Sequence, residues 1–176
     1  RTEFVGRTSE FSTLASAWRR ARKGRAQVGL IQGPPGIGKT RLGEELIPVV
    51  EVDEGRVVDV KAAEVERNLD WGTVTQLVRV LHGLPGAAGI SNRSAAILGS
   101  LVPSLAGLQA PGGDHALPPG SQPAAVADAL LDLVAAVAEE MPLFILVDDL
   151  QWVDKKSRAV LSHLGRSLAG EPVGLL

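Results

Sequence analysis

Residues 33–40 read Gly-Pro-Pro-Gly-Ile-Gly-Lys-Thr and fit the phosphate-binding loop pattern G-x-x-x-x-G-K-[ST] without a mismatch. Gly36 and Gly38 give this stretch access to backbone conformations that other residues avoid, so successive N–H groups can turn inward toward phosphate oxygens. The Lys39 ammonium can reach the β- and γ-phosphates, and the Thr40 hydroxyl can ligate Mg²⁺. The loop therefore predicts a nucleotide phosphate site, with binding residues Gly33, Gly36, Ile37, Gly38, Lys39, Thr40 and Arg41.

The sequence on either side of the loop supplies the strand and the helix that a phosphate-binding loop requires. Residues 28–31 form a short, mostly apolar run, and Leu42, Leu46 and Ile47 follow the loop at helical spacing. Pro48 is predicted to end this helix early. The N-terminus of the helix would face the phosphates and add its dipole to their binding. This context disfavours the alternative of a chance glycine loop, or of one retained only for its shape.

The composition of the 176 residues bounds the class of protein. The length suits one α/β domain, and a net charge of −2 argues against nucleic-acid binding by bulk electrostatics. The absence of cysteine excludes disulfides, thiolate metal sites and thiol catalysis. No apolar run approaches the ~20 residues that cross a bilayer, and the N-terminus lacks the apolar core of a secretory signal. We therefore expect a cytoplasmic protein with no membrane partner.

Helical and extended apolar patterns alternate along the rest of the chain. This alternation predicts an α/β P-loop NTPase fold, with a mostly parallel sheet flanked by helices and the ligand at the carboxyl ends of the strands. Between 84 and 123 the chain turns irregular, with one helix expected within 94–108, so we interpret this stretch as an insert. The remaining predicted elements are helices over 9–23 (with Ser9 as N-cap), 71–82, 124–140 and 155–169, and strands over 56–61, 143–147 and 172–176.

The end of the first predicted helix is strongly basic, with five Lys or Arg residues between 19 and 25. One interpretation is a solvated face that complements the negative end of the helix dipole. The other is a patch for a partner or a nucleic acid, which is the less common use of such a run.

A second set of candidate site residues follows the apolar run 143–147, whose lack of alternation is typical of a strand buried on both faces of a parallel sheet. Asp148, at the end of this strand, is placed to hold Mg²⁺ beside the phosphate loop, usually through water. Asp149 can orient or polarise the attacking water, or can instead be structural and cap the next turn. We predict Thr40 and Asp148 as metal ligands, and Lys39 and Asp149 as catalytic residues.

Three further segments resemble one family of bacterial signalling ATPases. Residues 144–154, Phe-Ile-Leu-Val-Asp-Asp-Leu-Gln-Trp-Val-Asp, resemble its "LLVLDDLHWAD" signature, although Gln151 stands where the family usually has His. Residues 4–7 followed by Glu10 resemble its "hVGRexE" opening, and residues 63–71 resemble its "ExERdlPf" stretch. The family comprises AAA-like modules of the STAND class, found at the N-terminus of large LuxR-type transcriptional regulators. The resemblance covers nearly the whole chain outside the irregular insert.

The resemblance implies roles for residues that the phosphate loop does not explain. Val5, Gly6 and Arg7 would lie near the adenine or ribose, although Arg7 can also be an ordinary surface cation. Trp152 and Asp154 would lie beside the site. Packing is the commoner role for a residue such as Trp152, and Asp154 can instead cap the helix that follows.

The resemblance also implies an ATP-binding switch, with ATP or ADP and Mg²⁺ as ligands and slow hydrolysis as the reset. ATP is favoured over GTP because the guanine-reading pattern N-K-x-D is absent. Residues 1–176 would be an N-terminal nucleotide-binding module, truncated before the family's final strand, sensor, helical lid and winged helix. We therefore expect nucleotide binding with weak or absent turnover. The expected partners are nucleotide, the downstream domains of the same chain and a second copy of the module, with DNA contacted only through a domain not present here.

Three other functions share the phosphate loop. A small-molecule P-loop phosphotransferase would need a lid rich in arginine, and residues 84–123 offer only Arg93. A non-hydrolysing interaction module would no longer bind nucleotide. An origin-recognition-type DNA loader has the same core but would need a winged helix. We rank all three below the switch.

Overall fold

The computed structural model describes residues 6–104 and 123–176. Within these ranges the chain forms one four-stranded sheet in which every pair of neighbouring strands is parallel, in the order β1-β4-β3-β2. The strands are β1 (Gln27–Val28), β2 (Arg56–Lys61), β3 (Leu143–Asp148) and β4 (Val173–Leu175). The predicted α/β fold with a parallel sheet is confirmed. Val5 and residues 105–122 of the predicted 84–123 insert lie outside the described residues.

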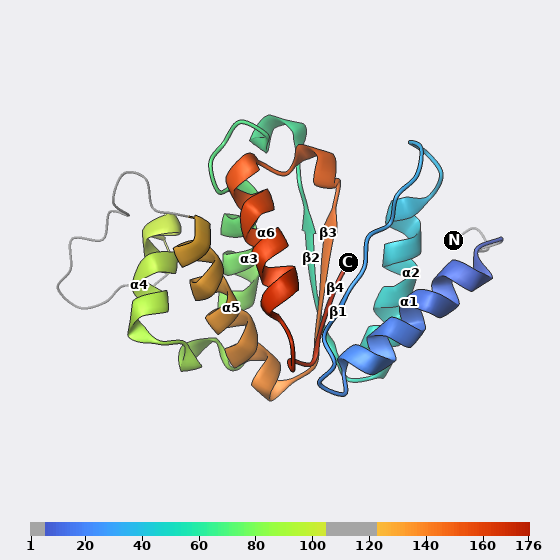
Figure 1. Ribbon diagram of the computed structural model, residues 1–176, viewed down its shortest axis with the longest axis horizontal. Helices are drawn as coiled ribbons and strands as arrows, with labels where there is room; N and C mark the ends of the chain where they lie inside the picture. Colours follow the sequence, from blue (N-terminus) through green and yellow to red (C-terminus); the bar gives the residue numbers. More distant parts are fainter. Residues whose placement is uncertain (1–5, 105–122) are drawn as a thin grey trace.

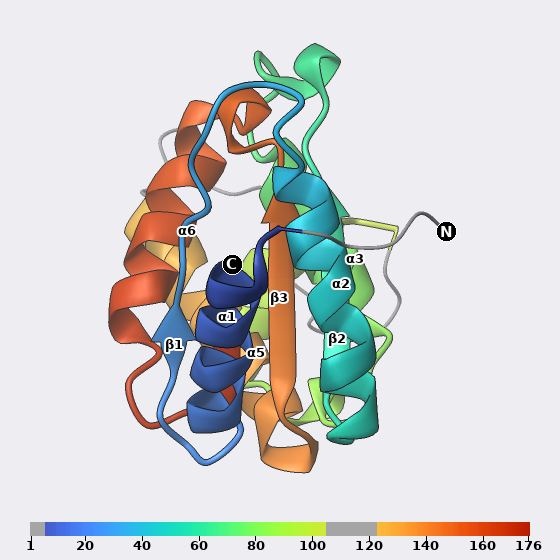
Figure 2. The ribbon, with the colours of Figure 1, turned by 90° about the vertical axis from the view of Figure 1, so that its right-hand side faces the viewer.

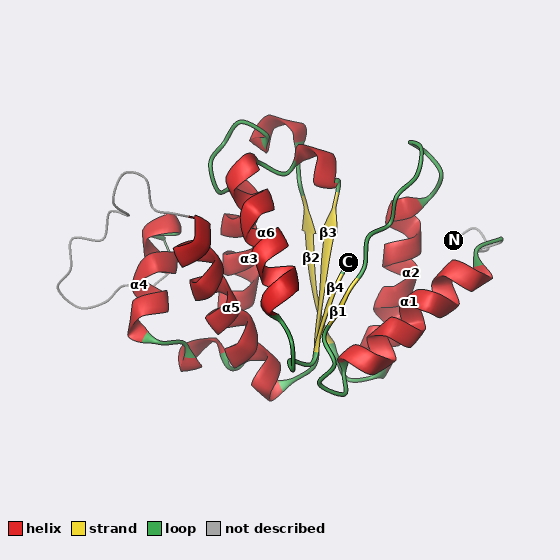
Figure 3. Ribbon diagram, viewed as in Figure 1, coloured by secondary structure: helices red, strands yellow, loops and turns green. Residues whose placement is uncertain are grey.

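Helices cover both faces of this sheet, which Figure 3 shows edge-on between two helical layers. One face carries α1 (Thr8–Ala21) and α2 (Lys39–Val52), which lie toward the viewer in Figure 2. The other face carries α3 (Gly72–His82), α5 (Pro123–Glu140) and α6 (Lys155–Ser167), and α4 (Asn92–Leu101) packs on α5 farther from the sheet (Figure 1). Three short 3₁₀ helices complete the described chain: η1 (Glu64–Glu66), η2 (Ala87–Gly89) and η3 (Leu150–Trp152).

The apolar strand β3 joins the two helical layers because its side chains point alternately to opposite faces. Phe144 and Leu146 pack into the smaller core cluster, with Trp18 of α1. Leu143 and Ile145 are completely buried in the larger cluster, under α3, α5 and α6. Every side chain of residues 143–147 is therefore buried, which explains why this run lacks the polar alternation of a one-sided strand.

The first strand is shorter than the sequence predicts. Residues 28–31 were expected to form it, but the strand covers Gln27–Val28, and the Gly29 N–H adds one hydrogen bond to the Leu175 carbonyl at 2.8 Å. In the described sheet β1 is an edge strand paired with the three-residue β4, so the backbone beyond Gly29 has no strand partner. Leu30 is accordingly 61% exposed, which is unlike a buried strand residue.

The helix after the loop is longer than predicted. Pro48 was expected to end it, but α2 runs on to Val52 with Pro48 inside. An interior proline costs about 3 kcal/mol, because it removes one backbone hydrogen bond and crowds the preceding turn. The turn beyond Pro48 buries Val50 completely and packs Val49 against the same core cluster, and burial of an apolar side chain gains about 1.5–3 kcal/mol. Tertiary packing therefore overrides the local signal.

Ser9 is not the N-cap of the first helix, as the sequence suggested. Arg7 occupies that position, and the Ser9 hydroxyl donates to the Glu10 carboxylate at 2.6 Å within the first turn. The basic run at the other end of α1 is partly engaged inside the domain. Arg20 donates to the Gln27 side chain and Arg22 pairs with Asp53, which supports the structural interpretation for these two residues.

Candidate nucleotide-binding site

The phosphate loop connects β1 to α2, and α2 begins at Lys39 within the motif. Gly36 and Gly38 adopt φ angles of 75° and 89°, in the left-handed region. A Cβ atom added at either glycine would meet nothing within 4 Å, so these positions require glycine for its backbone freedom and not for space. The predicted reason for these two glycines is therefore what the structure shows.

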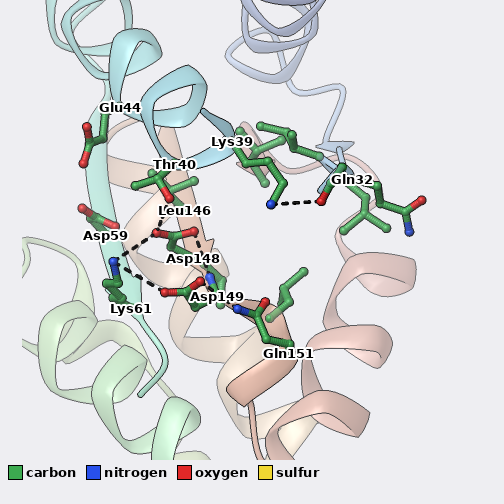
Figure 4. A pocket seen from close by; sticks show the side chains of 16 residues that line it. Gln32, Lys39, Thr40, Glu44, Asp59, Lys61, Leu146, Asp148, Asp149 and Gln151 are labelled. Carbon is green, nitrogen blue, oxygen red and sulfur yellow. Dashed lines mark hydrogen bonds and ion pairs between the residues drawn. The ribbon is translucent and has the colours of Figure 1, made fainter. Parts of the chain in front are cut away.

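Lys39 is folded back over its own loop. Its ammonium donates to the carbonyls of Gly33 and Pro34, both at 3.0 Å, and its side chain lines the pocket (Figure 4). A phosphate oxygen would offer this ammonium a charged acceptor in place of two neutral ones, and charge-assisted hydrogen bonds are the stronger kind.

Thr40 and Asp148 are in direct contact, although they are 108 positions apart. The Thr40 hydroxyl donates to Asp148 Oδ2 at 2.9 Å, which joins the start of α2 to the end of β3. Strands β1 and β3 are not neighbours in the sheet, because β4 lies between them. The loop that follows β1 therefore brings Thr40 to the end of β3. A hydroxyl and a carboxylate are hard oxygen donors that suit Mg²⁺, which commonly takes one or two protein ligands and completes its shell with phosphate and water.

Asp149 takes a backbone conformation that few non-glycine residues adopt, with φ at 57°. It precedes η3 but makes no side-chain cap, so the capping alternative for Asp149 has no hydrogen bond to support it. Its carboxylate accepts from Gln151 Nε2 at 2.9 Å and pairs with Lys61 Nζ at 3.5 Å. The strained turn holds this carboxylate in the same pocket as Asp148 (Figure 4).

Lys61 is a site residue that the sequence reasoning missed. It ends β2, in parallel register with Asp148, and its ammonium lies 3.6 Å from Asp148 Oδ2 and 3.5 Å from Asp149 Oδ2. The negative charge of Asp148, and then that of Asp149, raises the pKa of Lys61. The signal was available, because β2 was predicted over 56–61 and ligands gather at the carboxyl ends of parallel strands.

Asp59 and Glu44 extend the acidic side of the same pocket, and neither was predicted. The pKa of Asp59 is raised, first by loss of water around its carboxylate and then by the charges of Asp148 and Glu44. The pocket has a volume of about 430 Å³. Its charged lining residues are Lys39, Glu44, Asp59, Lys61, Asp148 and Asp149.

The predicted base-contacting residues lie outside this pocket as far as they are described. Arg7 donates to the Ile37 carbonyl at 2.6 Å, so the start of α1 is tied to the apex of the phosphate loop. Gly6 precedes it with φ at 92°. Arg41, in the first turn of α2, pairs with Glu45 at 3.5 Å and is not among the residues that line the pocket.

Asp154 is a helix cap and does not line the pocket. Its Oδ1 accepts from the N–H of Ser157 at 2.8 Å, which caps α6, and from the N–H of Trp71 at 3.2 Å, at the start of α3. The Ser157 hydroxyl in turn accepts from the N–H of Val74 at 3.1 Å. Of the two roles that the sequence left open for Asp154, the structure shows the cap.

Trp152 packs against residues 63–71, another of the segments that resemble the signalling ATPases. The Arg67 guanidinium lies 6.0 Å from the centre of its ring, which is within the range of a cation–π contact. Together with the Asp154 contacts, this joins residues 63–71 to residues 150–157. These two segments are thus one structural unit beside the end of β3, although they lie far apart in sequence.

A parallel sheet flanked by helices, with a glycine loop that leads into a helix and acidic residues at the end of β3, defines a P-loop nucleotide-binding module. The chain belongs to the AAA ATPase domain family, whose sequence model matches residues 3–176. It is similar to "Uncharacterized protein R02095" of Rhizobium meliloti (strain 1021), with 28% identity over 191 residues that cover 98% of this chain. The chain spans 18% of the length of that relative.

No solved structure matches the chain. Across the part of the chain that the structure describes, none of the helices combines the length and apolar character needed to cross a membrane.

Proposed function

We propose that this chain is the ATP-binding switch module of a larger regulatory protein, of the STAND class and with a transcriptional output of the LuxR type. ATP binding would favour one state, and slow hydrolysis at the γ-phosphate would return the module to the other. The contact between Thr40 and Asp148 carries the proposal, because it assembles both halves of a metal–phosphate site within an AAA ATPase domain. The resemblance of residues 144–154 to the signalling ATPases supports the finer assignment.

Phosphate binding in this proposal uses the loop and Lys39. The N–H groups from Gly36 onward and the dipole of the 14-residue α2 would face the phosphates, since Pro34 and Pro35 have no N–H to donate. The Lys39 ammonium would move from the carbonyls of its loop to the β- and γ-phosphates. Preorganised positive groups of this kind stabilise the charge that develops during phosphoryl transfer.

Thr40 and Asp148 would hold a Mg²⁺ ion, which when bound supplies positive charge to the phosphate oxygens. Asp149 would accept a hydrogen bond from the attacking water and orient it toward the γ-phosphate. Gln151 Nε2 donates to its carboxylate at 2.9 Å and would help to fix its position. The chain's own residues thus cover phosphate binding, metal binding and water orientation.

Slow turnover follows from what the pocket contains. Among the described residues that line it, the basic ones are Lys39 and Lys61, and no arginine is present. An arginine beside the γ-phosphate accelerates phosphoryl transfer by roughly 10³- to 10⁵-fold in P-loop enzymes. We therefore propose nucleotide binding with weak or absent hydrolysis for the module by itself.

The phosphotransferase alternative gains no support from the fold. Arg93 lies on α4 and lines a separate cleft between α4 and α5, together with Asp128 and Asp132. Helix α4 packs on the outside of α5, away from the phosphate loop (Figure 1).

Calorimetric titration with ATP and Mg²⁺, and separately with ADP and Mg²⁺, tests the proposal. We expect saturable binding of both nucleotides and hydrolysis below one turnover per second. Absence of heat with either nucleotide would favour the non-hydrolysing interaction module. Hydrolysis at several turnovers per second that Lys39→Ala abolishes would contradict the slow switch. The sequence of the full-length protein tests the output, because a helix-turn-helix near its far C-terminus is expected for the LuxR-type regulator.

A further inference from the structure

The lysine at the end of β2 occupies the acidic side of the pocket. Lys61 lies on a sheet edge, its side chain is 64% exposed, and its ammonium lies between the carboxylates of Asp148 and Asp149. Figure 4 shows the ammonium with dashed lines to both acids. The contacts measure 3.6 and 3.5 Å. The ammonium is therefore close enough to offset the charge of both carboxylates, and neither contact is a short one.

The same carboxylate oxygen faces both Lys61 and the predicted metal ligand. Asp148 Oδ2 accepts from the Thr40 hydroxyl at 2.9 Å and lies 3.6 Å from Lys61 Nζ. A divalent cation held between Thr40 and Asp148 would therefore stand within a few ångströms of the ammonium. Two positive groups so close together repel each other, and an exposed lysine with four rotatable bonds is the one that can move.

The charge balance of the pocket indicates that Lys61, and not Lys39, is the cation that offsets the acidic residues. The described lining carries four carboxylates, from Glu44, Asp59, Asp148 and Asp149. Lys39 is bound to loop carbonyls on the other side of the pocket. Among the described lining residues, Lys61 is thus the cation that offsets the acids at the end of β3.

We propose that Lys61 is a displaceable counter-ion of the metal site, which holds Asp148 and Asp149 together in the metal-free pocket and must be pushed aside when a divalent cation binds. The proposal rests on the proposed nucleotide function and adds a residue that lowers the affinity of the pocket for the metal. The proposal also explains why the module would bind metal mainly as a metal–nucleotide complex. Carboxylates paired with Lys61 bind a cation weakly by themselves, and the phosphates add further ligands.

Calorimetry with ADP provides the first test. For each variant, the dissociation constant of ADP is measured in EDTA and in excess Mg²⁺, and the ratio of the two is the magnesium advantage. Lys61→Gln removes the charge that competes with the cation, so we expect the magnesium advantage to rise about tenfold. Lys61→Arg keeps the charge and should leave the ratio near that of the native chain. Lys23→Gln, two residues beyond the end of α1, changes the net charge equally and is the control.

A second test does not need the nucleotide. Binding of Mn²⁺ alone is followed through the loss of the electron paramagnetic resonance signal of free Mn²⁺. Lys61→Gln should bind Mn²⁺ about tenfold more tightly than the native chain and the Lys23→Gln control. An unchanged or weaker Mn²⁺ affinity, or an unchanged magnesium advantage, would overturn the proposal for Lys61. Failure of the native chain to bind ADP would overturn the nucleotide function instead, and the Mn²⁺ comparison would still decide the role of Lys61.

Discussion

The two walls of the pocket differ in charge and in construction. The loop wall, residues 33–40, presents backbone N–H groups, a helix N-terminus and Lys39. The strand wall, at the carboxyl ends of β2 and β3, consists of side chains, most of them acidic. In the proposed function, a bare nucleotide would suit the first wall and be repelled by the second, whereas a metal–nucleotide complex would carry charges that suit both walls. We therefore expect the pocket to prefer the complex over either component alone.

The largest effect is expected on the loop wall. Lys39→Ala removes the ammonium that would move from the loop carbonyls to the phosphates, and hydrogen bonds between charged groups are worth more than neutral ones. We expect ADP binding to weaken about 100-fold, both in EDTA and in Mg²⁺. Calorimetry measures this loss, with Lys23→Ala as a charge-matched control. A loss confined to Mg²⁺ would show that Lys39 acts through the metal, and the two walls would then not be independent.

A buried cap, Asp154, follows the strand wall in the chain and joins the starts of two helices. Asp154 Oδ1 accepts two backbone N–H groups, at the starts of α3 and α6, while its Oδ2 is buried with no hydrogen-bond partner among the described atoms. Asp154→Ala leaves both donors unpaired, so we expect the free energy of unfolding to fall by about 2 kcal/mol. Urea denaturation measures the change.

Asp154→Asn separates the acceptor from the charge at this cap. The amide keeps the accepting oxygen and removes a buried negative charge, so its effect should be much smaller than that of alanine. If the two variants were equally unstable, the carboxylate charge would be the essential property and the cap geometry would not.

The difference between the loop wall and the strand wall also explains how much of the site could be predicted from the sequence. Loop chemistry is local: Gly36, Gly38 and Lys39 act through a short stretch of chain, so a pattern of eight residues contains the geometry. The contact between Thr40 and Asp148 could also be anticipated, since the phosphate loop and the end of the buried strand had to meet at one edge of the sheet. Lys61 and Asp59 belong to no local pattern, and their place depends on the register of β2 with β3.

Prediction of the fold failed where packing outweighs a local signal. The strand β2 has the predicted bounds, 56–61, and β3 adds Asp148 to the predicted 143–147. Pro48 and Ser9 were misjudged because both are strong local signals, a helix breaker and a favoured cap. At Pro48 the continued burial of α2 decides the outcome, and at Ser9 the helix begins one residue earlier, at Thr8. A sequence pattern carries no measure of such competing contacts.

A smaller effect, specific to the metal, is expected at the end of β3. Asp148→Asn removes one predicted metal ligand and one negative charge, while the amide oxygen can still accept from the Thr40 hydroxyl. We expect the magnesium advantage for ADP to fall about tenfold, because the metal loses a ligand while ADP in EDTA meets one repelling charge fewer and binds no more weakly than before. Calorimetry in the two buffers gives both numbers. Equal weakening in both buffers would mean that Asp148 supports the loop itself, and the division between the walls would not hold.

The smallest effect concerns the free energy that the acidic wall costs the metal-free fold. The pKa of Asp59 is raised by loss of water and by Asp148 and Glu44, so its charged form is disfavoured in the folded state. At a pH well below the ordinary aspartate value of 3.8, both states are protonated and the penalty is absent. The penalty appears as the pH rises through that value and is complete above the raised pKa.

Asp59→Asn removes this penalty. The variant should therefore be more stable than the native chain at pH 7, by about 0.5 kcal/mol because the carboxylate is well exposed, and equally stable near pH 3. Urea denaturation at the two pH values measures the difference. A gain that persisted at low pH would come from packing and not from charge. A gain that disappeared in excess Mg²⁺ would show that the metal relieves the same repulsion, and that the acidic wall is held at a cost until the complex binds.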